Sequence, residues 1–357
     1  MSRTLIAFLG LLICRAPLSG EESLVPRAEP VSRAVVYFAD DSGATEQFIE
    51  NRAITAKMVN GLIVALTGKP SVAAAWRSLV APTDRVGIKI SASGGLYFST
   101  HPGIVEAIAA GLRAAGVPAN QIVVWDRDAS DLRTAGFATR KDQFAVRGIE
   151  PVRGYDANAQ FNEPFMGKLI WGDLEFQERQ RKSPRGRASE TDQLSSVSHL
   201  ATIVSRDLTK IINVPVLGDE PNCGLAGALY NVTIPNVDNW RRFLQTEGPG
   251  AEAIPALYAN ERIGPKVVVH IMDGLIAQYA AGPRGNPNYA FPHGRIYASK
   301  DPVALDATAL RQIEQWRKDA HLPPIGRRAE WLKSAEDEGL GVFSEERIVL
   351  APVELRR

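Results

Sequence analysis

Charged and polar side chains follow several apolar runs of this sequence at the point where each run stops. Because the carboxyl ends of parallel strands meet at one edge of a sheet, side chains at such positions converge on a crevice. We predict that this crevice binds a small polar or anionic molecule. An enzyme is the leading interpretation, and a binding protein without turnover is the alternative. The expected lining residues are Lys89, Ser91, Gly94, Gly95, His101, Asp126, Asn213, Asp273 and Asp301.

Lys89 and His101 are the candidate catalytic residues. Lys89 lies inside the apolar run Val86–Ile90, and a lysine is rarely buried there without a partner. Its roles could be a base or imine-forming amine, or a fixed positive charge for a phosphate or carboxylate. The structural alternative is a buried salt bridge with Asp126 on a neighbouring strand, and both it and the anion anchor are favoured over covalent catalysis.

His101 stands at the start of an expected helix, directly before Pro102 and shortly after Gly94 and Gly95. At this position an imidazole can act as an acid or base, or donate to an anion. Residues near it and at other strand ends are expected to contact the substrate. These substrate-binding candidates are Ser91, Gly94, Gly95 and Asn213.

Three aspartates at strand ends are candidate ligands of a divalent cation, the one cofactor that the sequence suggests. Asp126, Asp273 and Asp301 offer the oxygen ligands that magnesium and calcium prefer. Each also has an ordinary structural explanation, since Asp273 precedes a glycine as in a turn and Asp301 precedes a proline as in a helix cap. Asp306 follows Asp301 at a spacing that does not share a helix face well, so joint coordination by that pair is not expected.

Composition excludes several classes of function. Lys and Arg number 41 against 40 Asp and Glu, which leaves no overall field for nucleic acid or an anionic membrane. Of the two cysteines, Cys14 lies in an apolar leader, so Cys223 alone would remain, and no iron–sulfur cluster is expected. The chain has neither a Gly-x-Ser-x-Gly elbow nor a Gly-x-Gly-x-x-Gly loop, which disfavours a standard hydrolase triad and a nicotinamide site.

The first residues have the proportions of a secretory signal. An early arginine, the apolar run Leu5–Cys14 and a small-residue exit predict a signal peptide over residues 1–20, followed by a linker over 21–33. The run is too short to span a bilayer, and no other stretch approaches that length. We therefore expect an extracytoplasmic protein, periplasmic or secreted. The alternative is a frayed apolar N-terminus on a cytosolic protein.

The elements that would position these residues alternate between strands and helices. A strand, a loop and a helix are expected over Arg85–Gly111, with further strands near residues 34–38, 121–126, 210–216, 266–273 and 295–299. Helices are expected near 44–66, 196–204, 225–231 and 301–320. This order predicts an α/β fold with a mostly parallel, doubly wound sheet over 34–357 and helices on both faces. An irregular excursion or a subdomain is expected at about 140–195.

Several segments in a fixed order resemble a bacterial family named domain of unknown function 362 (DUF362), over about residues 34–355. They are Trp76–Leu79, Asp84–Ile90, Ser99–Pro102, Val124–Arg127, Ile212–Val216, Ile271–Leu275 and Ala298–Asp306. The resemblance implies an α/β protein and brings no settled activity or oligomeric state. Some relatives carry ferredoxin-type cysteine clusters, which this chain lacks. The family pattern also tends to place lysines where Gly218 and Tyr230 stand here, so this chain would bind a different or less anionic ligand.

Overall fold

The structure is a computed structural model that describes residues 33–151, 153–161, 197–243 and 252–355. The expected signal peptide, the linker except Arg33, and most of the expected excursion lie outside these residues. Among the described residues, no helix is both long enough and apolar enough to cross a bilayer.

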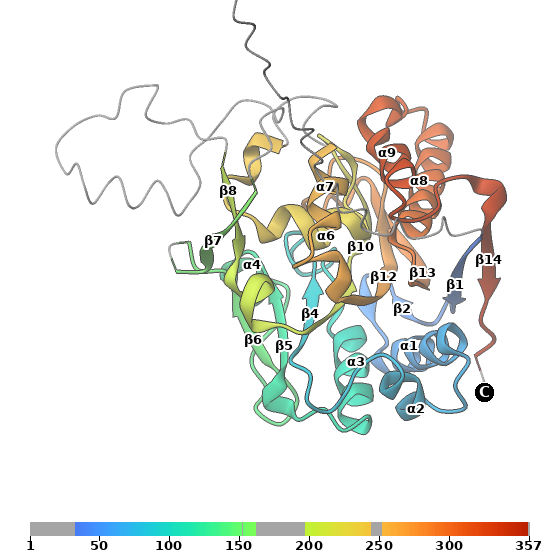
Figure 1. The fold of residues 1–357 in the computed structure, drawn as a ribbon. Coiled ribbons are helices and arrows are strands. Elements are labelled where there is room, and N and C mark those ends of the chain that lie inside the picture. The colour runs from blue at the N-terminus through green and yellow to red at the C-terminus, as the bar shows by residue number, and fades with distance from the viewer. Residues whose placement is uncertain (1–32, 152, 162–196, 244–251, 356–357) are drawn as a thin grey trace, which may run out of the picture.

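One ten-stranded sheet forms the centre of the molecule (Figure 1). The strand β13 runs antiparallel to both of its neighbours, and the other strands along the main path share one direction. The short β10 (Val216–Glu220) pairs in parallel with β12, and β11 (Gly224–Leu225) pairs with β10. The main order is β14 (Ile348–Pro352), β1 (Ala34–Asp40), β13 (Ala290–Ser299), β12 (Val267–Gln278), β9 (Lys210–Val214), β4 (Val86–Ile90), β5 (Ile122–Asp126) and β6 (Ala145–Gly148).

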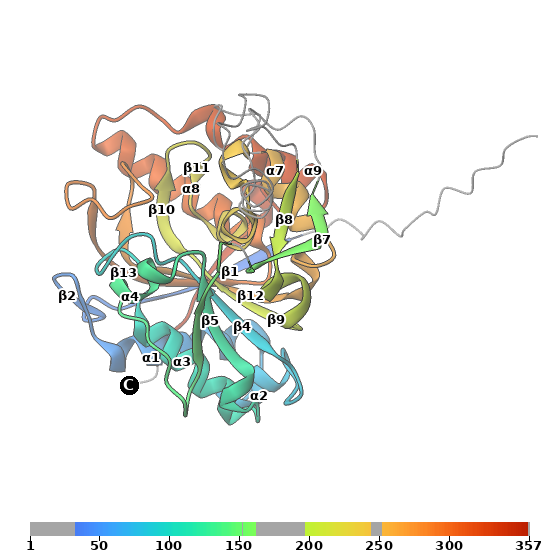
Figure 2. The ribbon, with the colours of Figure 1, turned by 90° about the vertical axis from the view of Figure 1, so that its left-hand side faces the viewer.

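Helices cover both faces of this sheet, as the two perpendicular views show (Figures 1 and 2). On one face, α1 (Arg52–Thr67), α2 (Val72–Arg77) and α3 (Pro102–Ala114) share a core with Val86, Ile88 and Ile90. On the other face lie α6 (Ala228–Thr233), α7 (Ala253–Ala259), α8 (Pro302–Asp319) and α9 (Trp331–Asp337), which form a second core. The predicted fold class, a mostly parallel sheet with helices on both faces, is confirmed.

The central strand, loop and helix form because β4 is buried throughout and Pro102 occupies the first turn of α3. Hydroxyl groups close the intervening loop. The Ser91 amide donates to Thr100 Oγ1 at 2.9 Å, and that hydroxyl donates to the Val214 carbonyl at 2.8 Å. Side chains of β4 alternate between the two faces, so Val86, Ile88 and Ile90 face α3 while Lys89 faces α6.

Two expected elements differ in the structure. The helix expected over 196–204 is wrong: Ser198–Ala201 form β8, which pairs antiparallel with β7 (Tyr155–Phe161), and a π-helical turn follows at Ile203–Asp207. All four residues of β8 are buried, so pairing with a distant segment outweighs the local helical pattern. The start of the excursion expected at 140–195 is also regular, because β6 extends the main sheet and β7 follows it.

Candidate functional site

A cleft of about 730 Å³ opens where β4, β5 and β6 end. In open α/β sheets, this carboxyl edge is the usual place for a ligand. The cleft takes residues from the loops after these strands, from α6, from the 3₁₀ turn Trp240–Phe243 and from the segment before β13. They include Ser91, Ser93, Asp126, Arg127, Asp128, Asp131, Glu150, Tyr230, Asn231, Trp240, Arg241 and Arg284.

Lys89 lies beneath the floor of this cleft. Its ammonium donates to Asp126 Oδ1 at 2.6 Å, to the Ile90 carbonyl at 2.7 Å and to Asn231 Oδ1 at 3.2 Å. These bonds use all three of its donors, and the side chain is fully buried. Burial lowers the pKa of Lys89, and the charge of Asp126 opposes that change. Lys89 therefore does not itself line the cleft, and it is connected to the cleft through Asn231 and through Asp126, the ion-pair partner that the sequence suggests.

Asp126 lines the cleft but is already engaged by the protein. Besides Lys89, its Oδ1 accepts the Arg127 amide at 2.8 Å, and its Oδ2 accepts the Ala92 amide at 2.7 Å. Charge-assisted bonds of this kind are stronger than neutral ones, so they fix the carboxylate in place. The ion pair forms because β4 and β5 are adjacent and parallel, with Lys89 level with Trp125.

A chain of buried hydrogen bonds continues from Lys89 into the protein. The side-chain amide of Asn231 donates to Asn213 Oδ1 at 2.8 Å, and the side-chain amide of Asn213 donates to His270 Nδ1 at 3.0 Å. His270 Nε2 then lies 3.3 Å from the Tyr258 hydroxyl. Burial lowers the pKa of His270 to about 3, so its imidazole is neutral and its Nδ1 accepts. Asn213 is thus buried beneath the cleft rather than exposed to a ligand.

Two of the three arginines that line the cleft, Arg241 and Arg284, have unused guanidinium donors among the described residues. The guanidinium groups of Arg127 and Arg241 lie 5.1 Å and 4.7 Å from the centre of the Trp240 ring. Arg127 also donates to the Val237 carbonyl at 2.8 Å. Within the part of the chain that the structure describes, the guanidinium groups of Arg241 and Arg284 make neither a hydrogen bond nor an ion pair shorter than 4 Å with the cleft carboxylates.

Two of the four carboxylates that line the cleft, those of Asp126 and Asp128, are engaged by the protein. Asp128 caps α4 (Ala129–Thr134) and accepts the Ser130 amide and hydroxyl, both at 2.7 Å. Burial raises the pKa of Asp131, and the nearby charges of Asp128 and Asp126 raise it further. The charge of Arg284 lowers this pKa in part. The cleft therefore holds two carboxylates, of Asp131 and Glu150, and two guanidinium groups, of Arg241 and Arg284, without hydrogen-bond partners among the described residues.

His101 and Asp273 form a separate pair, outside the residues that line the cleft. Asp273 Oδ2 accepts from the His101 amide and lies 2.7 Å from His101 Nδ1, while Asp273 Oδ1 accepts the Leu275 amide at 3.0 Å. Burial lowers the pKa of His101, but the adjacent Asp273 and the charge of Glu50 outweigh it and raise that pKa overall.

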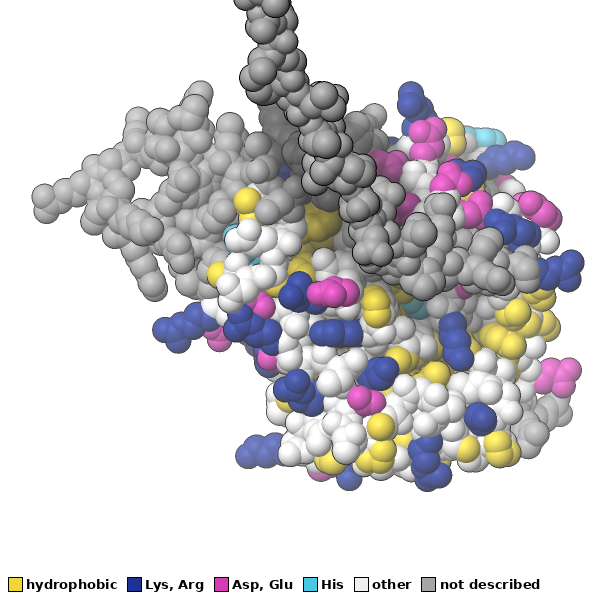
Figure 3. Space-filling model, in the orientation of Figure 1, with side chains coloured by type: hydrophobic (Ala, Val, Ile, Leu, Met, Phe, Trp, Pro, Cys, Tyr) yellow, Lys and Arg dark blue, Asp and Glu magenta, His cyan; other side chains and the backbone are white. Residues whose placement is uncertain are grey.

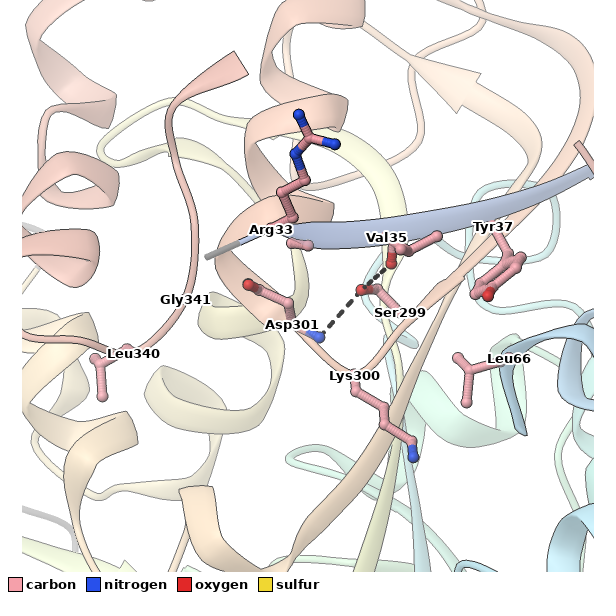
Figure 4. A pocket seen from close by; sticks show the side chains of 10 residues that line it. Arg33, Val35, Tyr37, Leu66, Ser299, Lys300, Asp301, Leu340 and Gly341 are labelled. Carbon is pink, nitrogen blue, oxygen red and sulfur yellow. Dashed lines mark hydrogen bonds between the residues drawn. The ribbon is translucent and has the colours of Figure 1, made fainter. Parts of the chain in front are cut away.

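Asp301 lies apart from both groups because β13 is antiparallel. The end of β13, Ser299, is level with His270, so the chain that follows leads back toward the amino ends of the parallel strands. There Asp301 caps α8, with Oδ1 accepting the Ala304 amide at 2.8 Å and Oδ2 accepting the Val342 amide at 3.0 Å. Figure 4 shows it in a different pocket, of about 350 Å³, beside Ser299 and Gly341. Burial raises its pKa to about 6.

The three candidate metal ligands, Asp126, Asp273 and Asp301, thus make separate contacts. Over residues 33–151, 153–161, 197–243 and 252–355, no three His, Cys, Asp or Glu side chains are grouped so that they could hold a metal ion.

The two loop glycines, Gly94 and Gly95, form a turn and do not line the cleft. A Cβ on Gly94 would lie 1.8 Å from the Phe98 carbonyl oxygen, and Gly95 has a φ of +76°, which favours glycine. Of the substrate-binding candidates, Ser91 alone lines the cleft. Residues that sequence reasoning missed are Arg127, Asn231, Trp240, Arg241 and Arg284. Arg127 directly follows Asp126 and could have been found from that position, whereas nothing local singles out Arg284.

Comparison with known proteins gives a family and a distant structural neighbour. No curated protein matches the chain. A crystal structure of a protein from Thermotoga maritima is similar with a TM-score of 0.41 and 12% sequence identity. The similarity covers 76% of this chain and 60% of that one. The family model named domain of unknown function (DUF362) matches residues 86–311, more than half of the sequence. The matched range contains β4, α3, β5 and all the residues that line the cleft, from Ser91 to Arg284. The chain therefore belongs to the DUF362 family.

Proposed function

We propose that the cleft at the carboxyl ends of β4, β5 and β6 binds a small anionic molecule. The observation that carries the proposal is a pair of cleft guanidinium groups with unused donors. Arg241 and Arg284 keep guanidinium donors without protein partners among the described residues, while Asp126 and Asp128 are already engaged by backbone and side-chain donors. A guanidinium group pairs well with carboxylate or phosphate because its donors match two oxygens at once.

The attraction is local to the cleft. The whole chain has a net charge of +1, and basic side chains are spread over the visible face rather than gathered in one patch (Figure 3). An anion is therefore not drawn by the protein as a whole, and the arginines of the cleft must supply the selectivity.

The size and lining of the cleft support a small organic ligand. Its volume of about 730 Å³ lies within the usual range for small-molecule sites. Trp240, Ile234 and Pro283 supply apolar contact, while Ser91, Tyr230 and Asn231 supply hydrogen-bonding groups. Such a mixture suits an anion with a carbon skeleton better than a bare inorganic ion.

Lys89 and His101 have limited roles in this proposal. The Lys89 ammonium holds Asp126 in place rather than meeting the ligand, because its three donors are used. His101 is not a lining residue, so acid or base chemistry by His101 in this cleft has no support from the geometry. Binding is thus the better supported function, and turnover in the cleft would need groups other than these two.

A ligand screen with matched variants tests the proposal. Purified full-length protein is heated with inorganic phosphate, sugar phosphates, and di- and tricarboxylic acids, and the best ligand is then titrated calorimetrically. We expect Arg284→Gln to weaken binding by about tenfold or more, as expected for a lost charge-assisted bond. Arg113→Gln, at an exposed position on α3 away from the cleft, changes the net charge equally and should leave the affinity unchanged. Equal effects of both variants, or no stabilising anion, would refute the proposal.

We also propose export, from the apolar run Leu5–Cys14 and its small-residue exit. N-terminal sequencing of the mature protein tests this. A mature chain that begins shortly after residue 20 supports export, and an intact Met1 in the cytosolic fraction contradicts it.

A further inference from the structure

Four charged side chains of the cleft have unused hydrogen-bonding capacity, two of each sign. Asp131 on α4, Glu150 after β6, Arg241 in the 3₁₀ turn Trp240–Phe243 and Arg284 before β13 all line the cleft. Within the part of the chain that the structure describes, none of these four side chains makes a hydrogen bond or an ion pair. The cleft therefore presents charge of both signs to a ligand.

The backbone at Arg284 is fixed by buried polar side chains. Gln278, fully buried at the end of β12, donates its side-chain amide to the Arg284 carbonyl at 3.0 Å and accepts the Asn286 amide at 2.7 Å. Asp219 accepts the Gly282 amide at 3.0 Å. These bonds hold the chain on both sides of Arg284, so its guanidinium group extends into the cleft from a defined point.

The carboxylate of Asp131 also extends from a fixed element. It belongs to α4, which Asp128 caps and which the buried Leu132 joins to the core. Burial raises the pKa of Asp131, because the charged form loses water without gaining a donor. The charge of Arg284 also acts on Asp131, although these two described side chains form no ion pair. Opposite charges thus share the cleft without neutralising each other by contact.

A ligand with one kind of charge satisfies only half of this arrangement. An anion without a cationic group pairs with Arg241 and Arg284 but adds negative charge near Asp131 and Glu150. An ammonium group has three donors for carboxylate oxygens, and a guanidinium group has a planar set of donors for carboxylate or phosphate oxygens. A molecule that carries both an ammonium and an anionic group therefore uses all four side chains.

We propose that the ligand of the cleft carries a protonated amine as well as its anionic group, with the anionic group on Arg241 and Arg284 and the amine on Asp131 and Glu150. Amino acids and aminosugar phosphates have this chemistry, and a cleft of about 730 Å³ has room for either. The inference rests on the proposed anion site and narrows it to one class of ligand.

Pairs of ligands that differ in one amino group test the inference on the full-length protein. The pairs are aspartate with succinate, glutamate with glutarate, and glucosamine 6-phosphate with glucose 6-phosphate, each titrated calorimetrically at neutral pH. In the pair that binds most tightly, we expect the amine-bearing member to bind about tenfold more tightly, because it gains charged hydrogen bonds. A site that recognises the anionic group alone predicts the opposite order, since the amine-free member is more negative.

Asp131→Asn separates recognition of the amine from a general effect of charge. The variant should reduce the preference for the amine-bearing member to less than about threefold, because a charged partner of the amine is lost. Asp142→Asn removes the same charge at an exposed position outside the cleft and should keep the wild-type preference. Glu150→Gln, at an exposed position, gives the same test if Asp131→Asn does not fold. A preference that survives in both cleft variants would contradict the inference.

The ligand series also distinguishes failure of this inference from failure of the proposed function. The inference alone is wrong if the amine-free member binds as tightly or more tightly, or if only anions outside these pairs bind. If no anion binds, the anion site and this inference both fail. Putrescine, a diamine without an anionic group, tests the amine by itself. If putrescine binds as tightly as the best amine-bearing anion, the cleft is a cation site and both proposals are wrong.

Discussion

Lys89 and Asp126 lie on adjacent parallel strands and form a buried ion pair, with 2.6 Å between Lys89 Nζ and Asp126 Oδ1. Lys89 is fully buried, while Asp126 keeps a small exposed fraction at the floor of the cleft. A fully buried positive charge therefore holds in position a carboxylate that lines the cleft.

Removal of the Lys89 charge should destabilise the protein strongly. Lys89→Met leaves Asp126 buried without its counter-ion, which we expect to cost about 3–5 kcal/mol in the free energy of unfolding. Denaturant unfolding measures this cost. The double variant Lys89→Met with Asp126→Asn removes both charges and should recover part of the loss. If the Lys89→Met variant is as stable as the wild type, the ion pair of Lys89 and Asp126 does not stabilise the floor of the cleft.

Loss of Asp301 should affect stability and not the ligand. Asp301→Ala removes the cap of α8 and the bond to the Val342 amide, which we expect to cost about 1–2 kcal/mol. The anion affinity of the cleft should remain unchanged, because Asp301 lies in a different pocket. Calorimetric titration of the variant checks this, and a large fall in anion affinity would place Asp301 in the functional site after all.

His270 should make the protein less stable in acid. Its folded pKa of about 3 lies below its ordinary value of 6.5, so the unfolded state binds more protons at any pH between them. Its contribution is present in full above pH 6.5 and is lost as the pH falls toward 3, with a slope of up to about 1.4 kcal/mol per pH unit. Urea unfolding at several pH values should show a smaller slope for His270→Leu than for the wild type. Equal slopes would mean that His270 is not held neutral.

An extra cation in the cleft should strengthen anion binding. Tyr230 lines the cleft. Tyr230→Lys should raise the affinity for the best anion on the order of tenfold, because a charged hydrogen bond contributes about 1.5–3 kcal/mol before its losses. Gly218→Lys is not an equivalent variant, since a Cβ there would lie 2.5 Å from the Phe98 ring. Weaker binding by Tyr230→Lys would contradict an anion site.

The parallel half of the fold could be predicted from the sequence, and so could the ion pair at its centre. The apolar run Val86–Ile90, Pro102 and the strand ending at Asp126 carry strong local signals, and they place Lys89 beside Asp126 once the strands are adjacent. The direction of β13 has no local signal, because it depends on pairing with β1 and β12. The sequence analysis took this strand to be parallel to the others, and it therefore placed Asp301 at the carboxyl edge of the sheet.

Much of the candidate site depends on contacts between distant segments. Trp240, Arg241 and Arg284 meet Asp126 in the cleft from loops far along the chain, and no spacing predicts this. His101 was identified by its position before Pro102, but its partner Asp273 lies far along the sequence. Such contacts are set by the packing of the sheet and its helices, not by periodicity.

A crystal structure with the anion that stabilises the protein most tests the central claim most directly. The account predicts that the anionic group of the ligand lies against the guanidinium groups of Arg241 and Arg284, with its carbon skeleton between Trp240 and Asp126. Ligand density at another place, with only solvent in this cleft, would contradict it.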